Sequence, residues 1–203
     1  MNYGAQMPTW PRLTTMLVSC LVAFCAAVPG AGAAEDDAFD QLMARLGQRS
    51  HGHVTFTERH ITSVLDRPVE ASGELLYDAP DRLEKRTLKP RPERLVLDHG
   101  MLTIERRHRE QQVALADYPQ VAPYIDSIRA VLAGDRPALE RAFRIEFSNS
   151  GNEWDLLLLP LNAQVATEFA SIRIVGTGDI IRTVTTQLAN GDRSIMTLGT
   201  PDP

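Results

Sequence analysis

Few residue patterns in this sequence could support catalysis. His51 and His53 alternate along a predicted strand, which would place both imidazoles on one face, where a nearby carboxylate could complete a metal site. A polar strand entry at the domain edge accounts for the same pair, and we favour it. A hydrolase would have to combine Ser148 or Ser150 with His99, and neither serine lies in a nucleophile motif. The sequence has no phosphate-binding loop, dinucleotide fingerprint or H-E-x-x-H motif, so we predict no enzyme activity, no metal and no cofactor.

A basic segment lies within an otherwise acidic chain. The whole sequence has a net charge of −5, yet residues 82–109 contain nine Lys and Arg against four Asp and Glu. Arg106, Arg107 and Arg109 end this segment in a predicted hairpin and form a candidate docking surface for an anionic partner or a lipid headgroup. A solvated outer face with local ion pairs is the alternative. The net negative charge argues against nucleic acid as a partner.

The first 34 residues have the three parts of a secretory signal peptide. Arg12 is the only charged residue among them, residues 13–28 are almost wholly apolar, and small residues lead to Ala34, after which we expect cleavage. The alternatives are a retained membrane anchor and a lipoprotein modified at Cys20. Because Cys20 and Cys25 both lie in this segment, the predicted mature domain, residues 35–203, has no cysteine. We therefore expect an exported, periplasmic protein.

The mature chain is predicted to form one mainly β domain. A sequence of 203 residues that is 43% hydrophobic can bury a core, and no repeat or linker divides it. About eleven short strand-like segments are separated by turn signals, which predicts an antiparallel barrel or a strongly curved sheet. They are residues 53–65, 69–77, 83–88, 94–97, 101–106, 111–116, 143–148, 154–159, 171–175, 180–188 and 194–198. Residues 154–159 are apolar on both faces, which predicts that a leading helix over 39–46, capped by Asp36, packs behind the sheet.

Two helices are predicted between the sixth and seventh strands. Apolar residues recur at helical spacing over 118–132, with Asp117 as the N-cap and Gly134 as the stop. This stripe consists of Tyr118, Val121, Ile125, Ile128 and Leu132, widened by Tyr124 and Val131. A second, short helix is predicted over 137–142. Helices inserted between strands of one sheet must cover either its face or its mouth.

Several short motifs, in this order, resemble the LolA family of periplasmic carriers of outer-membrane lipoproteins, especially its LolA-related branch. Residues 54–58, VTFTE, are similar to the family's F-x-Q-type first strand, and residues 73–83, GELLYDAPDRL, to its G-x-L-x-x-x-x-P-x-x-F segment. Residues 98–102, DHGML, are similar to its D-G-x-x-L turn, and the helices over 118–142 stand where the family has lid helices. Ala79 replaces the family's common arginine, and residues 103–106 replace its aromatic W-x-Y strand.

The resemblance implies an incomplete antiparallel β-barrel that lid helices close around an apolar cavity. Its cargo would be the acyl chains of outer-membrane lipoproteins, or of a related lipid or glycolipid, and its partners an inner-membrane release complex and an outer-membrane acceptor. A lipid-sensing or envelope-assembly module of the same fold, which binds without shuttling, is the alternative. We expect a monomer. The residues expected in the cavity and lid are Phe56, Leu76, Tyr118, Val121, Tyr124, Ile125, Ile128, Leu132 and Trp154.

Overall fold

One antiparallel sheet organises the whole domain. The computed structural model describes residues 31–107, 109–119 and 122–201. Its strands are β1 (His51–Ile61), β2 (Val69–Asp78), β3 (Arg82–Lys89), β4 (Glu93–Asp98), β5 (Met101–Arg106), β6 (Arg109–Ala114), β7 (Phe143–Ser150), β8 (Glu153–Pro160), β9 (Phe169–Thr177), β10 (Ile180–Leu188) and β11 (Arg193–Leu198). They are ordered β6-β5-β4-β3-β2-β1-β11-β10-β9-β8-β7. The sheet therefore consists of two meanders joined where β1 pairs with β11.

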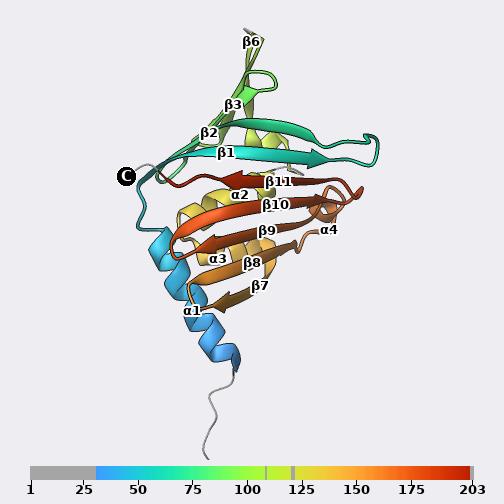
Figure 1. Ribbon diagram of the computed structural model, residues 1–203. Coiled ribbons are helices and arrows are strands. Elements are labelled where there is room, and N and C mark those ends of the chain that lie inside the picture. Colours follow the sequence, from blue (N-terminus) through green and yellow to red (C-terminus); the bar gives the residue numbers. More distant parts are fainter. Residues whose placement is uncertain (1–30, 108, 120–121, 202–203) are drawn as a thin grey trace, which may run out of the picture.

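The prediction of about eleven strands in an incomplete barrel is confirmed. Strands β6 and β7 are free edges, so the sheet curls without closing (Figure 1). The helices are α1 (Ala31–Leu46), α2 (Ala122–Leu132), α3 (Arg136–Ala142) and α4 (Ala163–Ala166), with a 3-10 turn at Leu115–Asp117. Helix α4 has no counterpart among the predicted helices, because four residues are too few to show helical periodicity. Within the described ranges, no helix is long and apolar enough to cross a membrane.

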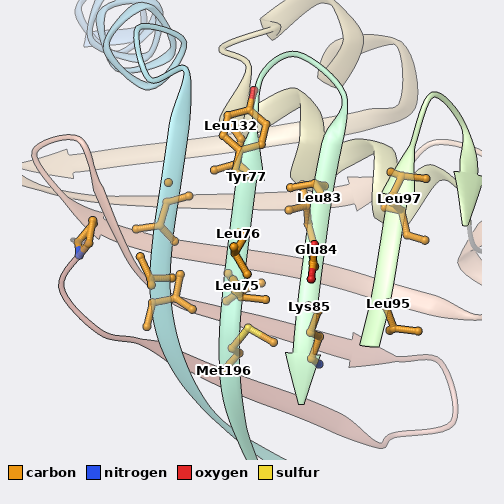
Figure 2. A pocket seen from close by; sticks show the side chains of 18 of the residues that line it. Leu75, Leu76, Tyr77, Leu83, Glu84, Lys85, Leu95, Leu97, Leu132 and Met196 are labelled. Atoms are coloured by element: carbon orange, nitrogen blue, oxygen red, sulfur yellow. The ribbon is translucent and has the colours of Figure 1, made fainter. Parts of the chain in front are cut away.

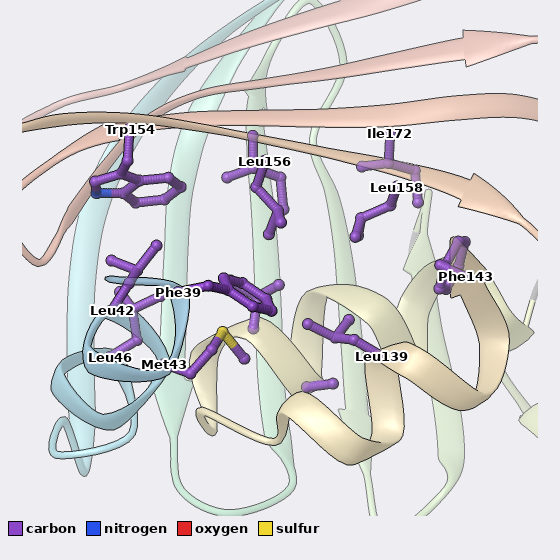
Figure 3. Close-up of a cluster of buried hydrophobic side chains, with 13 residues drawn as sticks. Phe39, Leu42, Met43, Leu46, Leu139, Phe143, Trp154, Leu156, Leu158 and Ile172 are labelled. Carbon is purple, nitrogen blue, oxygen red and sulfur yellow. The ribbon is translucent and has the colours of Figure 1, made fainter. Parts of the chain in front are cut away.

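The main core lies between one half of the sheet's inner face and helices α1 and α3. Leu156 and Leu158 of β8 point toward Leu42 of α1 and Leu139 of α3, and all four side chains are 0% exposed (Figure 3). The expectation that the leading helix packs behind the sheet is therefore wrong. It packs on the inner face, and Leu157, which strand alternation turns outward, is only partly buried.

Helix α1 begins earlier than predicted and ends where expected. Because it starts at Ala31, Asp36 lies inside the helix rather than at its cap, and its carboxylate is 3.2 Å from the guanidinium of Arg136 in α3. At the other end, the Gly47 N–H donates to the Met43 carbonyl at 2.9 Å. Apart from residues 31–34, the predicted signal peptide lies outside the described residues and stays a prediction.

Truncating Leu156 should destabilise the protein more than truncating its neighbour Leu157. Leu156→Ala leaves a cavity in the core and should lower the free energy of unfolding by about 3 kcal/mol. Leu157→Ala, on the other face of the same strand, should cost about 1 kcal/mol or less. Chemical denaturation measures both losses. Equal losses would contradict the assignment of Leu156 to the packed face.

Candidate functional site

A pocket of about 370 Å³ lies on the other half of the sheet's inner face. Strands β1 to β5, β10 and β11 form its wall, and helix α2 forms the opposite side (Figure 2). Most of the lining is aliphatic, as in pockets that hold small apolar ligands. The sheet contributes Val54, Leu75, Leu83, Leu95, Leu97, Leu102, Val184, Met196 and Leu198, and the helix contributes Tyr124, Ile125, Ile128 and Leu132.

Strand pairing brings the aliphatic residues of the wall together. Leu75 of β2 lies opposite Val54 of β1, and Leu83 of β3 lies opposite Leu97 of β4. Side chains at paired positions point to the same face of a sheet. Residues that are far apart in the sequence therefore form one continuous apolar surface.

Helix α2 lies at the boundary between the core and the pocket. Ala130 and Val131 are buried in the core cluster with residues of α1 and α3, whereas Ile125 and Ile128 line the pocket. The apolar stripe predicted for this helix is therefore divided between two environments. One side of α2 is packed in the core, and the other lines the pocket.

Among the residues described, a single ion pair links α2 to the sheet. The Arg129 Nη1 atom is 2.9 Å from Oδ1 of Asp81, in the turn between β2 and β3. Both side chains are about one third exposed, so water screens the pair and its contribution is about 1 kcal/mol or less. Packing of Val131, which is 1% exposed, therefore holds α2 more firmly than this ion pair does.

The structure brings some of the predicted cavity and lid residues to the pocket and places others elsewhere. The predicted residues that line the pocket are Leu76, Tyr124, Ile125, Ile128 and Leu132. Alternation turns the Leu76 side chain to the face opposite that of Leu75, so it does not belong to the continuous aliphatic surface of the inner face. Phe56 and Trp154 are buried outside the pocket lining, Tyr118 is exposed, and Val121 lies outside the described residues. Ligand contact stays a prediction for the whole set.

A polar cluster interrupts the aliphatic lining. Glu58 is 6% exposed, and its carboxylate accepts hydrogen bonds from Lys85 Nζ at 2.6 Å and Ser194 Oγ at 2.5 Å. His60 Nε2 lies 3.5 Å from the same carboxylate, and the Lys85 ammonium lies 5.0 Å above the Phe56 ring. Burial acts to raise the pKa of Glu58, but the charge of Lys85 and these hydrogen bonds outweigh it and lower the pKa below its ordinary value. Glu58 is therefore ionised at neutral pH.

Two hydroxyl groups extend this cluster toward α2. The Thr186 Oγ1 atom of β10 lies 3.3 Å from the Tyr124 hydroxyl, and the Tyr124 ring stacks on Phe169 with centroids 5.1 Å apart. Burial raises the pKa of Tyr124, so the phenol stays protonated at neutral pH. A hydrogen-bond donor on the covering helix thus faces the same pocket as the Glu58–Lys85 pair.

Glu58 and Lys85 were not predicted as pocket residues, although the sequence contains one signal for Glu58. Val54, Phe56 and Glu58 alternate along one strand, so Glu58 falls on the face that the two apolar residues mark as buried. A carboxylate on a buried face requires a partner. Its partner, Lys85, lies in a run of basic residues in the sequence. The neighbouring Arg82 and Arg86 bind Glu84 on the outer face, so the run itself does not reveal that Lys85 turns inward.

A second ion pair lies at the opposite end of the pocket. Arg49 donates to Oδ2 of Asp179 from Nη2 at 2.6 Å and from Nε at 3.2 Å. The hydrogen bond from Arg49 is the main cause that lowers the pKa of Asp179. The pair joins the segment between α1 and β1 to the turn between β9 and β10, and both side chains are partly exposed.

The predicted basic segment divides between the two faces of the sheet. Lys85 turns inward to Glu58, whereas Glu84, on the outer face and 4% exposed, is bound by Arg82, Arg86 and Arg94 at 3.0, 2.5 and 2.6 Å. The hydrogen bonds from Arg94 and Arg86 lower the pKa of Glu84 to about 2, although burial opposes the shift. The alternative of an outer face with local ion pairs therefore holds for Arg82, Arg86 and Arg94.

The three arginines of the candidate docking surface lie together at the tip of the β5–β6 hairpin. Arg106 and Arg109 face each other across the hairpin, and Arg107 adopts a left-handed turn conformation between them. Arg106 contacts Glu93, while no ion pair of Arg107 or Arg109 is found in the described part of the chain. The tip projects away from the helices, at the top of Figure 1.

The histidine pair does not assemble a metal site. His51 lies 3.8 Å from Asp78 and His53 lies 3.6 Å from Glu74, each pair on neighbouring strands. Over the described ranges, no three His, Cys, Asp or Glu side chains come close enough together to hold a metal ion.

These features define a curled β-sheet protein with an apolar pocket between its inner face and a covering helix. The chain belongs to the family described as outer membrane lipoprotein carrier protein LolA-like, whose model matches residues 31–201. This match confirms the resemblance seen in the sequence. Among curated proteins, none matches the sequence.

Several solved structures are similar to this chain at low sequence identity. A LolA superfamily protein of Nitrosomonas europaea is 9% identical, with a TM-score of 0.47 over 82% of this chain and 92% of that one. The MucA/MucB complex of Pseudomonas aeruginosa is 10% identical, with a TM-score of 0.46 over 81% of this chain and 56% of that one. A putative outer membrane lipoprotein-sorting protein domain of Vibrio parahaemolyticus is 8% identical, with a TM-score of 0.45 over 81% and 90%. Similarities this distant do not bear on function.

Acid should remove the stabilisation that Glu84 provides. The pKa of Glu84 is about 2 in the fold and about 4.3 in an unfolded chain, so its contribution is complete above about pH 4.5 and is lost as the pH falls toward 2. Glu84→Gln should lower the free energy of unfolding by about 2 kcal/mol at neutral pH and flatten its decline in acid. Denaturation across this pH range measures both effects. The exposed Glu110→Gln is the control, and a Glu84→Gln curve parallel to wild type would refute the assignment.

Proposed function

We propose that the protein is a periplasmic carrier that shields the acyl chains of outer-membrane lipoproteins, or of a related lipid, during transport from the inner to the outer membrane. The observation that carries this proposal is the aliphatic pocket between the sheet and α2 in a chain of the LolA-like family. The predicted signal peptide supports the periplasmic location. We propose that the protein is not an enzyme, since its pocket is lined mainly by aliphatic side chains.

The hydrophobic effect explains why such a cargo needs a carrier. Exposing an acyl chain to water costs about 0.8 kcal/mol per CH₂, so a long chain costs on the order of 10 kcal/mol. Inside the pocket, the acyl chain would contact aliphatic side chains from several strands and a helix instead of water. Helix α2 would act as the lid, because it has one side anchored in the core and the other over the pocket.

Lipid that co-purifies with the protein tests this function most directly. Mass spectrometry after native extraction should find bound acylated species. A carrier should then move that species between donor and acceptor membranes, with an inner-membrane release complex and an outer-membrane acceptor as its partners. Binding without transfer would instead support the lipid-sensing or envelope-assembly alternative, and protein free of acylated species would refute both.

Truncation of α2 residues should separate the pocket side of the helix from its core side. Ile125→Ala and Ile128→Ala remove side chains that face the pocket, so each should cost about 1 kcal/mol of stability and weaken binding of an acyl probe several-fold. Val131→Ala, on the same helix, removes a core side chain and should cost about 2 kcal/mol or more. Denaturation and fluorescent fatty-acyl titration measure the two quantities.

The control for this comparison is the binding affinity of the folded Val131→Ala protein, which should match wild type. If the Ile125 and Ile128 variants lose stability like the Val131 variant and keep full affinity, α2 is ordinary packing and not a lid.

Reversing the charge at the β5–β6 tip should weaken docking to an anionic partner. The variant Arg106→Glu/Arg107→Glu/Arg109→Glu should transfer cargo more slowly and lose the salt dependence of transfer, because steering by opposite charge is screened by salt. Stability should change little, since the tip lies away from the core. Stopped-flow transfer at several salt concentrations measures the effect.

Reversal of three exposed arginines elsewhere, Arg45, Arg141 and Arg144, provides a control of equal net charge. Should both triple variants transfer cargo alike, the hairpin tip is a solvated surface rather than a docking site.

A further inference from the structure

The inner face of the sheet changes from apolar to polar within two successive rows of three neighbouring strands, first in β1 and one row later in β11 and β10. In β1, Phe56 is followed on that face by Glu58 and then His60. The paired positions of β11 are Leu198, Met196 and Ser194, in that order. In β10, Val184 and Thr186 continue the last two rows. The pocket therefore has an apolar length and a polar end, and the polar end is formed by side chains from separate strands and from α2.

The polar end holds unused hydrogen-bonding capacity. A lysine ammonium has three N–H donors, and the Lys85 group gives one to Glu58 and none to any other described residue. The Tyr124 and Thr186 hydroxyls share one hydrogen bond between them, so one of their two protons is left without an acceptor in the described part of the chain. Two N–H groups of Lys85 and one hydroxyl proton of the Tyr124–Thr186 pair therefore have no described protein acceptor at this end of the pocket.

The charges at this end already cancel. The lowered pKa of Glu58 keeps it ionised, and Lys85 neutralises it at 2.6 Å. A ligand that brought its own carboxylate or phosphate would have to compete with Glu58 for this ammonium and would lie beside the Glu58 charge. The unused donors therefore favour an uncharged hydrogen-bond acceptor.

Building on the proposed function, we propose that the polar end of the pocket binds the ester or amide carbonyl that joins an acyl chain to its headgroup, with Lys85 Nζ and the Tyr124 hydroxyl as donors. The acyl chain then lies along the aliphatic wall formed by Leu75, Leu83 and Leu97. The site recognises an acylated molecule by its linkage as well as by its chain. Free fatty acid is discriminated against, because its carboxylate meets the charge of Glu58.

Probes of equal chain length test this linkage site. Methyl dodecanoate carries the carbonyl, dodecyl methyl ether lacks it, and dodecanoate carries a charge. Competition of each against a fluorescent dye bound in the pocket gives relative affinities. Wild type should prefer the ester over the ether by about ten-fold, the value of one hydrogen bond to a charged donor. Dodecanoate should bind more weakly than the ester.

Variants assign the preference to the named donors. Tyr124→Phe removes only the hydroxyl, and Lys85→Met removes the ammonium; both should bring the ester-to-ether ratio toward one. Because Lys85→Met leaves Glu58 buried without its cation, Glu58→Gln/Lys85→Met is measured beside it. Glu110→Gln, an exposed position of β6 outside the pocket lining, is the control and should keep the ratio.

The outcomes separate the two proposals. A preference for ester that Tyr124→Phe and the Lys85 variants reduce supports the linkage site. Equal binding of ester and ether by wild type, tighter binding of dodecanoate, or an unchanged ratio in all variants overturns the linkage site while leaving a pocket for acyl chains intact. Failure of all three probes to displace the dye overturns the proposed function and this site together.

Discussion

Burial of one continuous inner face of a curled sheet is the constraint on which the structure depends. Eleven strands turn apolar side chains to that face, but helices α1 and α3 fill only the half formed around β8 and β9. The remaining half forms the wall of the pocket. Helix α2 makes this arrangement possible, because Val131 is packed in the core while Ile128, one turn away, faces the pocket. The core thus fixes the helix that covers the pocket.

The two buried glutamates show how position in the sheet decides what a charge does. Glu84 lies on the outer face, where three arginines surround it and the cost of burial is met by several charge-assisted hydrogen bonds. Glu58 lies on the inner face with one lysine and one serine, beside an otherwise aliphatic surface. The first arrangement uses up the hydrogen-bonding capacity of its carboxylate and links β3 to β4. The second leaves N–H and O–H donors without a described protein acceptor. The Glu58–Lys85 pair is therefore suited to a ligand, and the Glu84 cluster to structure.

Local patterns in the sequence predicted most of the architecture and part of the site. Turn residues and alternation located the strands, and helical spacing placed Ile125, Ile128 and Leu132 on one stripe. The position of α1 was missed, because a strand that is apolar on both faces shows that it is buried but not which element covers each face. Phe56 and Trp154 share the inner face with the pocket, yet alternation cannot distinguish packed core from open lining. The Glu58–Lys85 pair depends on residues from β1 and β3 meeting across β2, which no local pattern encodes.

Ala79 stands where the LolA family commonly has an arginine, and an ion pair lies close to this position in the chain. In the family, that arginine precedes a proline and has a role in closing the lid. Here the turn that follows Pro80 contributes the carboxylate of Asp81, and helix α2 contributes the guanidinium of Arg129, 2.9 Å away. An ion pair between the turn and helix α2 is therefore present in this chain. Arg49, in contrast, binds Asp179 and joins two parts outside α2, so movement of α2 would break the Arg129 pair but leave the Arg49 pair in place. Because the Arg129 pair is partly exposed and weak, it restrains that corner of α2 less than the packing of Val131 in the core does.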